Sequence, residues 1–85
     1  MTSSEKPAIL FVDDEPNILS GIRGMLHPMR KKWKARYALG GEEGLELLDG
    51  HAFDVVVADM RMPGMSGVDF LLEVEERQPG AVRII

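Results

Sequence analysis

Two short runs made only of apolar residues constrain the fold of this chain more than any other feature. The first run is Ala8 to Val12, and it ends at Asp13 and Asp14. The second run is Val55 to Ala58, and it ends at Asp59. An uninterrupted apolar run of this length is typical of a strand that is buried on both faces, as in a parallel sheet. The runs therefore predict neighbouring parallel strands whose carboxyl ends carry acidic residues.

Segments with helical spacing alternate with strand-like segments along the whole chain. The expected strands cover residues 8–12, 33–39, 53–58 and 81–85, and the expected helices cover residues 15–26, 42–48 and 68–77. This alternation predicts an α/β fold, in which helices cover both faces of a parallel sheet. We expect the strand around Val55 at the centre of the sheet. The strand at 33–39, where polar residues alternate with apolar ones, is expected at an edge.

The first helix has recognisable start signals. Asp14 is expected to cap it, and Pro16 fits its first turn, where the missing N–H costs nothing. Five apolar residues at helical spacing form one stripe on this helix: Ile18, Leu19, Ile22, Met25 and Leu26. The residues before the first strand, Met1 to Pro7, are expected to be a flexible lead-in, so the domain would cover residues 8–85.

The acidic residues at the strand ends indicate a chemical site. Parallel strands place their carboxyl ends at one edge of the sheet, which is where ligands bind in folds of this type. Two carboxylates 4 Å apart repel each other by about 4 kcal/mol at an effective dielectric of 20. A divalent cation removes this repulsion, and a cluster of carboxylate oxygens suits Mg²⁺. Taken singly, Asp14 could instead be only a helix cap, and Asp59 only a turn former.

Composition narrows the class of protein. The 85 residues allow one small domain, and the net charge of −4 argues against nucleic-acid binding by the chain as a whole. There is no cysteine, so disulfides and thiolate metal sites are excluded. No apolar run approaches the roughly 20 residues that a membrane span needs, and a cytoplasmic location is expected. The basic residues between Arg30 and Arg36 are interpreted as a solvated loop that leads into a strand.

At this point two motifs resemble a known family. The segment Val12-Asp13-Asp14-Glu15-Pro16 and the segment from Asp54 to Gly67, which contains Asp59 and a Met-Pro-Gly loop, resemble the receiver domain of bacterial two-component response regulators. The resemblance runs from about Ala8 to Ile85. It implies a flavodoxin-like, doubly wound parallel sheet with the strand order second-first-third-fourth-fifth.

The resemblance also implies roles for individual residues. Asp59 would be the phosphoacceptor and would take a phosphoryl group from a sensor histidine kinase or a phosphotransfer protein. Asp14 and Asp59 would ligate Mg²⁺ directly, Asp13 would act mostly through water, and the backbone carbonyl of Arg61 would be a further ligand. Such a domain is a switch for a downstream effector domain and not a turnover enzyme.

The amino-acid sequence departs from the family pattern at its C-terminal end. The family places a Ser or Thr shortly beyond the position of Ile85 and a Lys at the end of a fifth strand, and both contact the phosphoryl group. We therefore expect a partial receiver domain of four strands and three helices, in which the fourth helix, the fifth strand and the fifth helix are missing.

Two alternatives remain open at this stage. A partial domain could be a non-signalling fragment that associates through its open sheet edge, for example as a homodimer. The chain could also be a Mg²⁺-dependent phosphatase of the haloacid dehalogenase type with an aspartate nucleophile. Those enzymes have Asp-x-Asp after the first strand, whereas Asp13 and Asp14 are adjacent.

Overall fold

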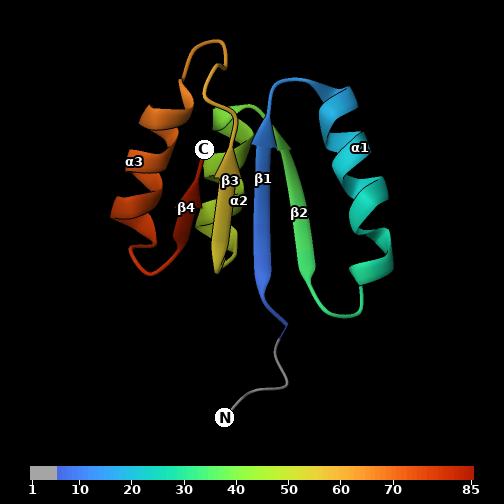
Figure 1. The fold of residues 1–85 in the computed structure, drawn as a ribbon. Helices are drawn as coiled ribbons and strands as arrows, with labels where there is room; N and C mark the ends of the chain where they lie inside the picture. The colour runs from blue at the N-terminus through green and yellow to red at the C-terminus, as the bar shows by residue number, and fades with distance from the viewer. Residues whose placement is uncertain (1–5) are drawn as a thin grey trace.

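The structure is a computed structural model that describes residues 6–85 (Figure 1). Its strands are β1 (Ala8–Asp13), β2 (Lys34–Leu39), β3 (Val55–Ala58) and β4 (Val82–Ile84). Its helices are α1 (Pro16–Leu26), the short 3₁₀ helix η1 (His27–Met29), α2 (Gly41–Gly50) and α3 (Gly67–Arg77). Most of the predicted lead-in, residues 1–5, lies outside the described residues.

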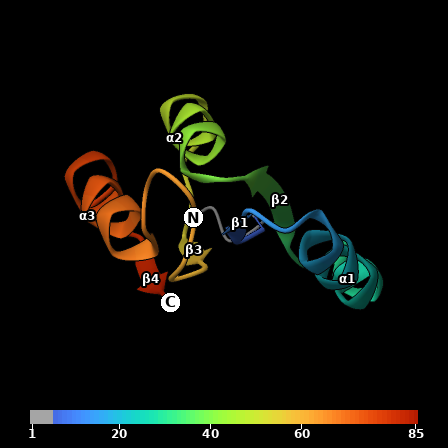
Figure 2. The same ribbon diagram turned by 90° about the horizontal axis from the view of Figure 1, so that it is seen from above.

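The four strands of the described part of the chain form one parallel sheet in the order β2-β1-β3-β4. Figure 2 shows that α2 and α3 cover one face of this sheet and that α1 lies on the other face. This arrangement confirms the predicted doubly wound, flavodoxin-like α/β fold. The strand at Val55 is internal, as expected, and β2 is at an edge.

The hydrophobic core lies between the sheet and the pair formed by α2 and α3. Its fully buried side chains come from two central strands and one helix: Leu10, Val12, Val56, Phe70 and Val74. At Gly44 an added Cβ atom would lie 2.8 Å from the ring of Phe70. Glycine at this position therefore lets α2 pack closely against α3.

The start of α1 differs from the prediction. Glu15, and not Asp14, is the N-cap residue, and its side chain accepts a hydrogen bond from the backbone N–H of Asn17 at 3.4 Å. Asp14 is thus not the capping residue of this helix. The apolar stripe of α1 is also only partly covered, since Leu19 is buried while Ile18 and Met25 are exposed.

Within residues 6–85, none of the helices has the length and apolar character needed to cross a lipid bilayer.

Candidate metal centre

The sheet itself places the acidic residues side by side. Val12 of β1 pairs with Ala58 of β3, and the backbone N–H of Asp59 donates to the carbonyl of Val12 at 3.0 Å. Asp13 is the last residue of β1, and Asp59 follows the last residue of β3 directly. Because the register between the two strands is fixed by these hydrogen bonds, the two carboxylates leave the sheet at neighbouring points.

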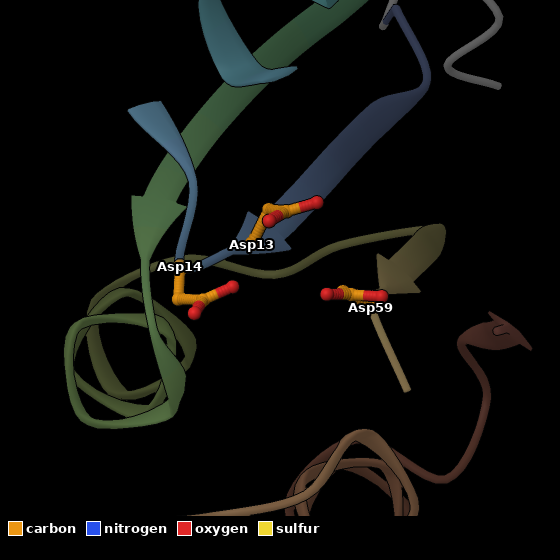
Figure 3. A group of neighbouring side chains, drawn as sticks. All are labelled: Asp13, Asp14 and Asp59. Carbon is orange, nitrogen blue, oxygen red and sulfur yellow. The ribbon is translucent and has the colours of Figure 1, made fainter. Parts of the chain in front are cut away.

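Figure 3 shows Asp13, Asp14 and Asp59 gathered at this edge of the sheet. One carboxylate oxygen from each residue lies within 4.8 Å of the others. Two oxygens bound to one Mg²⁺ are at most about 4.2 Å apart, since each lies about 2.1 Å from the ion. Neighbouring ligands of an octahedral Mg²⁺ are closer still, at about 3 Å, so the three carboxylates would have to draw together around a common ion. None of the three side chains is buried. Three hard, negatively charged oxygens fit a divalent cation such as Mg²⁺.

The electrostatics of Asp13 reflect this crowding. The pKa of Asp13 is raised above its usual value, first because partial burial disfavours the charged form and then because Asp59 and Asp14 repel that charge. The backbone N–H of Glu15, which donates to Asp13 Oδ1 at 2.9 Å, acts in the opposite direction and lowers the pKa. The charged form of Asp13 is thus disfavoured without a cation, and a bound cation would relieve the repulsion.

A close backbone contact holds the loop after Asp59 in place. The N–H of Gly67 donates to the carbonyl of Met60 at 3.0 Å. A Cβ atom at Gly67 would collide with the carbonyl oxygen of Asp59 and would lie 2.8 Å from Cα of Met60. Only glycine lets α3 begin this close to the acidic residue. Ser66 caps α3, because its Oγ accepts from the N–H of Asp69 at 3.1 Å.

The sequence places Gly67 in the loop and predicts that the helix begins one residue later, at Val68, whereas α3 begins at Gly67. The spacing of Ser66 and Asp69 is the signal that could have located the true start, because Ser followed by an acid three residues on is a capping pattern. The contact between Gly67 and Asp59 cannot be predicted from the sequence, because only the reversal of the loop brings the two residues together.

Two methionines anchor the same loop to the protein. Met62 is buried in the hydrophobic core, and the half-buried side chain of Met65 packs against the same core. Gly41 at the start of α2 leaves space for Met65, since a Cβ atom there would lie 2.7 Å from its sulfur. Arg61 directly precedes the first of these anchors, Met62, and its side chain is exposed. Its backbone carbonyl as a metal ligand stays a prediction.

Comparison with known proteins identifies the class of domain that carries this site. The family model described as the response regulator receiver domain matches residues 9–85. The chain is 35% identical over 83 residues to the hydrogenase transcriptional regulatory protein HoxA of Cupriavidus necator, which covers 98% of this chain and 17% of that protein. It is 30% identical over 77 residues to the nitrate/nitrite response regulator protein NarL of Escherichia coli, covering 91% of this chain and 36% of that protein.

The chain therefore spans about a third of these curated relatives at most. Among solved structures, it resembles the response regulator protein TrrA of Thermotoga maritima, which was crystallised in complex with Mg²⁺-BeF. The TM-score is 0.81 and the identity 33%, and the match covers 93% of this chain and 67% of that chain.

Proposed function

This chain belongs to the response regulator receiver domain family, and from this premise we propose that it is the phosphoacceptor domain of a two-component system, with Asp59 as the acceptor. The observation that carries the proposal is the convergence of three carboxylates within 4.8 Å at the carboxyl ends of β1 and β3. Asp59 is the member of this cluster that follows the central strand and precedes the anchored loop.

The proposed reaction is phosphoryl transfer from a phosphohistidine to the Asp59 carboxylate. An oxygen of Asp59 attacks the phosphorus atom, the P–N bond of the donor breaks, and the imidazole nitrogen keeps the bonding electron pair. The product is an acyl phosphate on the side chain. Such transfers depend on positioning and on neutralisation of charge more than on covalent chemistry by the protein. The backbone contacts of Asp59 with Val12 and Gly67 supply the positioning.

We assign the metal site to Asp13, Asp14, Asp59 and the backbone carbonyl of Arg61. When bound, Mg²⁺ would offset the negative charge of the attacking carboxylate and of the phosphoryl oxygens. Asp13 and Asp14 would hold the positively charged ion at the carboxyl end of β1. Without the ion, the negative charges of these two carboxylates would repel an incoming phosphoryl group. Their proposed role is therefore to bind the metal.

The relatives with longer chains indicate where the signal would go. HoxA is described as a transcriptional regulatory protein and NarL as a response regulator protein. We propose that a sensor histidine kinase or a phosphotransfer protein supplies the phosphoryl group, and that an effector domain responds through a shift between two conformations. In each cycle Asp59 itself would be phosphorylated, and the phosphoryl group would have to be removed before the next cycle. The domain would therefore not turn over a free substrate.

The test is phosphorylation from a small donor. The protein is incubated with acetyl phosphate and Mg²⁺, and its intact mass is measured. We expect one phosphoryl adduct that requires Mg²⁺ and is absent from Asp59→Asn. The matched control is Asp69→Asn, an exposed acid in the first turn of α3. Its adduct should equal that of the parent protein.

Two results would contradict the proposal. An adduct that persists in Asp59→Asn would place the acceptor elsewhere. Steady release of phosphate from a generic phosphoester, without a stable adduct, would favour the aspartate-nucleophile phosphatase instead.

A further inference from the structure

The cations of this acidic chain are concentrated in one segment. Between residues 16 and 41 there are six Lys and Arg residues and no Asp or Glu, although the chain holds 14 acids in total. The six are Arg23, Arg30, Lys31, Lys32, Lys34 and Arg36. They belong to the second half of α1, the turn that follows η1, and β2. The basic segment therefore lies along one edge of the sheet, beside β2.

None of these six cations has an ion pair within the described part of the chain. The ion pairs found among residues 6–85 both involve Arg77, with Asp49 at 2.6 Å and Glu73 at 3.4 Å. Arg23 instead lies over the ring of Tyr37, with its guanidinium carbon 4.7 Å from the ring centroid. The six cations thus form no direct ion pair among residues 6–85, and the carboxylate of Glu43 lies at the carboxyl end of the same edge.

A groove follows the same edge. One cavity of about 410 Å³ is lined by the end of α1 and by β2, including Arg30, Trp33 and Arg36. A second cavity of about 270 Å³ continues toward the carboxyl end of β2. Arg23 and Tyr37 line both cavities, which therefore adjoin each other, and the two together are called the groove here. Figure 2 shows β2 at the end of the sheet, with α1 and α2 on opposite sides of it.

The backbone of β2 adds hydrogen-bonding capacity to this groove. The N–H of Lys34 donates to Pro7 at 2.8 Å and the N–H of Gly40 donates to Asp13 at 3.1 Å, so the even-numbered amides face β1. Because amides alternate in direction along a strand, those of Ala35 and Tyr37 point away from the sheet. The next outward amide, at Leu39, is bound by the carboxylate of Glu43 at 2.8 Å.

We propose that the outer edge of β2 is a docking site for an extended, acidic segment of a partner protein, which adds to the sheet as a further strand. The partner backbone would pair with Ala35 and Tyr37, and its carboxylates would meet the unpaired cations. The contact with Leu39 shows the principle within the chain itself, since a carboxylate already binds an outward amide of β2 there. Strand addition of this kind combines backbone pairing with side-chain selectivity.

Two observations favour a protein partner over a nucleic acid. Outward backbone amides at an edge strand are matched by the carbonyls of another polypeptide. A long polyanion would also be repelled by the rest of the molecule, because the net charge is −4 in spite of the six clustered cations. A short acidic segment can lie along the part of the groove formed by Arg30, Trp33 and Arg36, whose described lining residues include no acid.

The probe for the test is a fluorescein-labelled peptide of four Glu-Val repeats, added to the protein at low salt and followed by fluorescence anisotropy. We expect saturable binding that weakens as salt is added. The same peptide with N-methylated backbone amides should bind at least about tenfold more weakly, because it cannot form a strand ladder. In amide NMR spectra, the Ala35 and Tyr37 signals should shift on binding.

Variants locate the site. Arg36→Glu reverses an exposed charge in the groove and should weaken peptide binding about tenfold. Lys34→Glu, at an exposed cation at the start of the same strand, is a second variant. Arg83→Glu, an exposed cation of β4 at the opposite edge of the sheet, is the matched control and should bind like the parent. Circular dichroism confirms that each variant is folded.

Three outcomes would overturn the proposal. The first is no saturable binding of the Glu-Val peptide. The second is equal affinity for the N-methylated peptide or for oligothymidylate, since a surface that binds any polyanion does not recognise a strand. The third is an equal loss of affinity in Arg83→Glu, which would mean that overall charge and not the β2 edge governs binding.

Discussion

Gly67 and Asp59 are locked together through their backbones, although a loop of seven residues separates them. The carbonyl oxygen of Asp59 occupies the place where a Cβ atom of residue 67 would stand. The start of α3 and the proposed phosphoacceptor therefore cannot move independently. Any side chain at position 67 must displace the loop, the helix, or both.

We predict that Gly67→Ala destabilises the protein by about 1–3 kcal/mol, the usual cost of a steric clash in a packed region. The displaced loop should also lower the rate of phosphorylation by acetyl phosphate. Urea unfolding and intact-mass kinetics measure the two effects. Gly80→Ala is the control, because nothing lies within 4 Å of its added Cβ atom. A Gly67→Ala variant that is as stable and as reactive as the parent would contradict the tight contact.

Gly24→Ala should have the opposite effect on stability. Gly24 lies inside α1, is exposed, and has no atom within 4 Å of an added Cβ. Alanine is favoured over glycine in a helix by up to about 1 kcal/mol, so we expect the free energy of unfolding to rise by that order. Urea unfolding measures it. A decrease in stability would show that this face of α1 is closer to other groups than the structure indicates.

Asp13→Asn should change the dependence of stability on pH in the absence of divalent cations. The pKa of Asp13 is raised in the folded state, chiefly by burial, so its contribution to stability is present below the unfolded pKa. It is lost as the pH rises through the folded pKa. The variant should therefore gain stability relative to the parent as the pH rises through that window, measured by urea unfolding in EDTA. With Mg²⁺ the order should reverse, because the variant loses a charged ligand. A difference between the two proteins that does not change with pH would contradict this account.

The pKa of Tyr37 should respond to Arg23. Burial raises the pKa of the Tyr37 phenol, and the nearby positive charge of Arg23 partly lowers it again. Arg23→Met keeps the bulk over the ring and removes the charge, so the pKa should rise further. Tyrosinate absorbance against pH measures it, with Tyr37→Phe as the blank. A lower pKa in Arg23→Met would mean that the loss of burial outweighs the loss of charge.

The sequence was sufficient to predict the sheet and the meeting of the acidic residues. Val12 and Ala58 end wholly apolar runs, and parallel pairing of such runs leaves little freedom for the residue that follows each one. The position of Asp13 beside Asp59 follows from this register alone.

The start of α1 was not predictable in the same way. Asp13 Oδ1 accepts the N–H of Glu15, and this local turn moves the cap one residue along the chain. Asp14 and Glu15 both have capping side chains, and the choice between them depends on what Asp13 binds. The groove beside β2 is also not predicted by the sequence, since its pattern of basic residues is typical of a solvated loop. Its walls come from α1, β2 and α2, which only the folded chain brings together.

Because six cations gather along β2 and at the end of α1, we expect the domain to have an electric dipole with its positive end at that edge. Acids are confined to the rest of the chain, including the cluster beyond β1 and β3. A charged partner experiences this field at a range set by the screening length, about 10 Å at 0.1 M salt. The partner is therefore rotated toward a preferred orientation before any contact forms, and encounters should become slower and less selective as ionic strength increases.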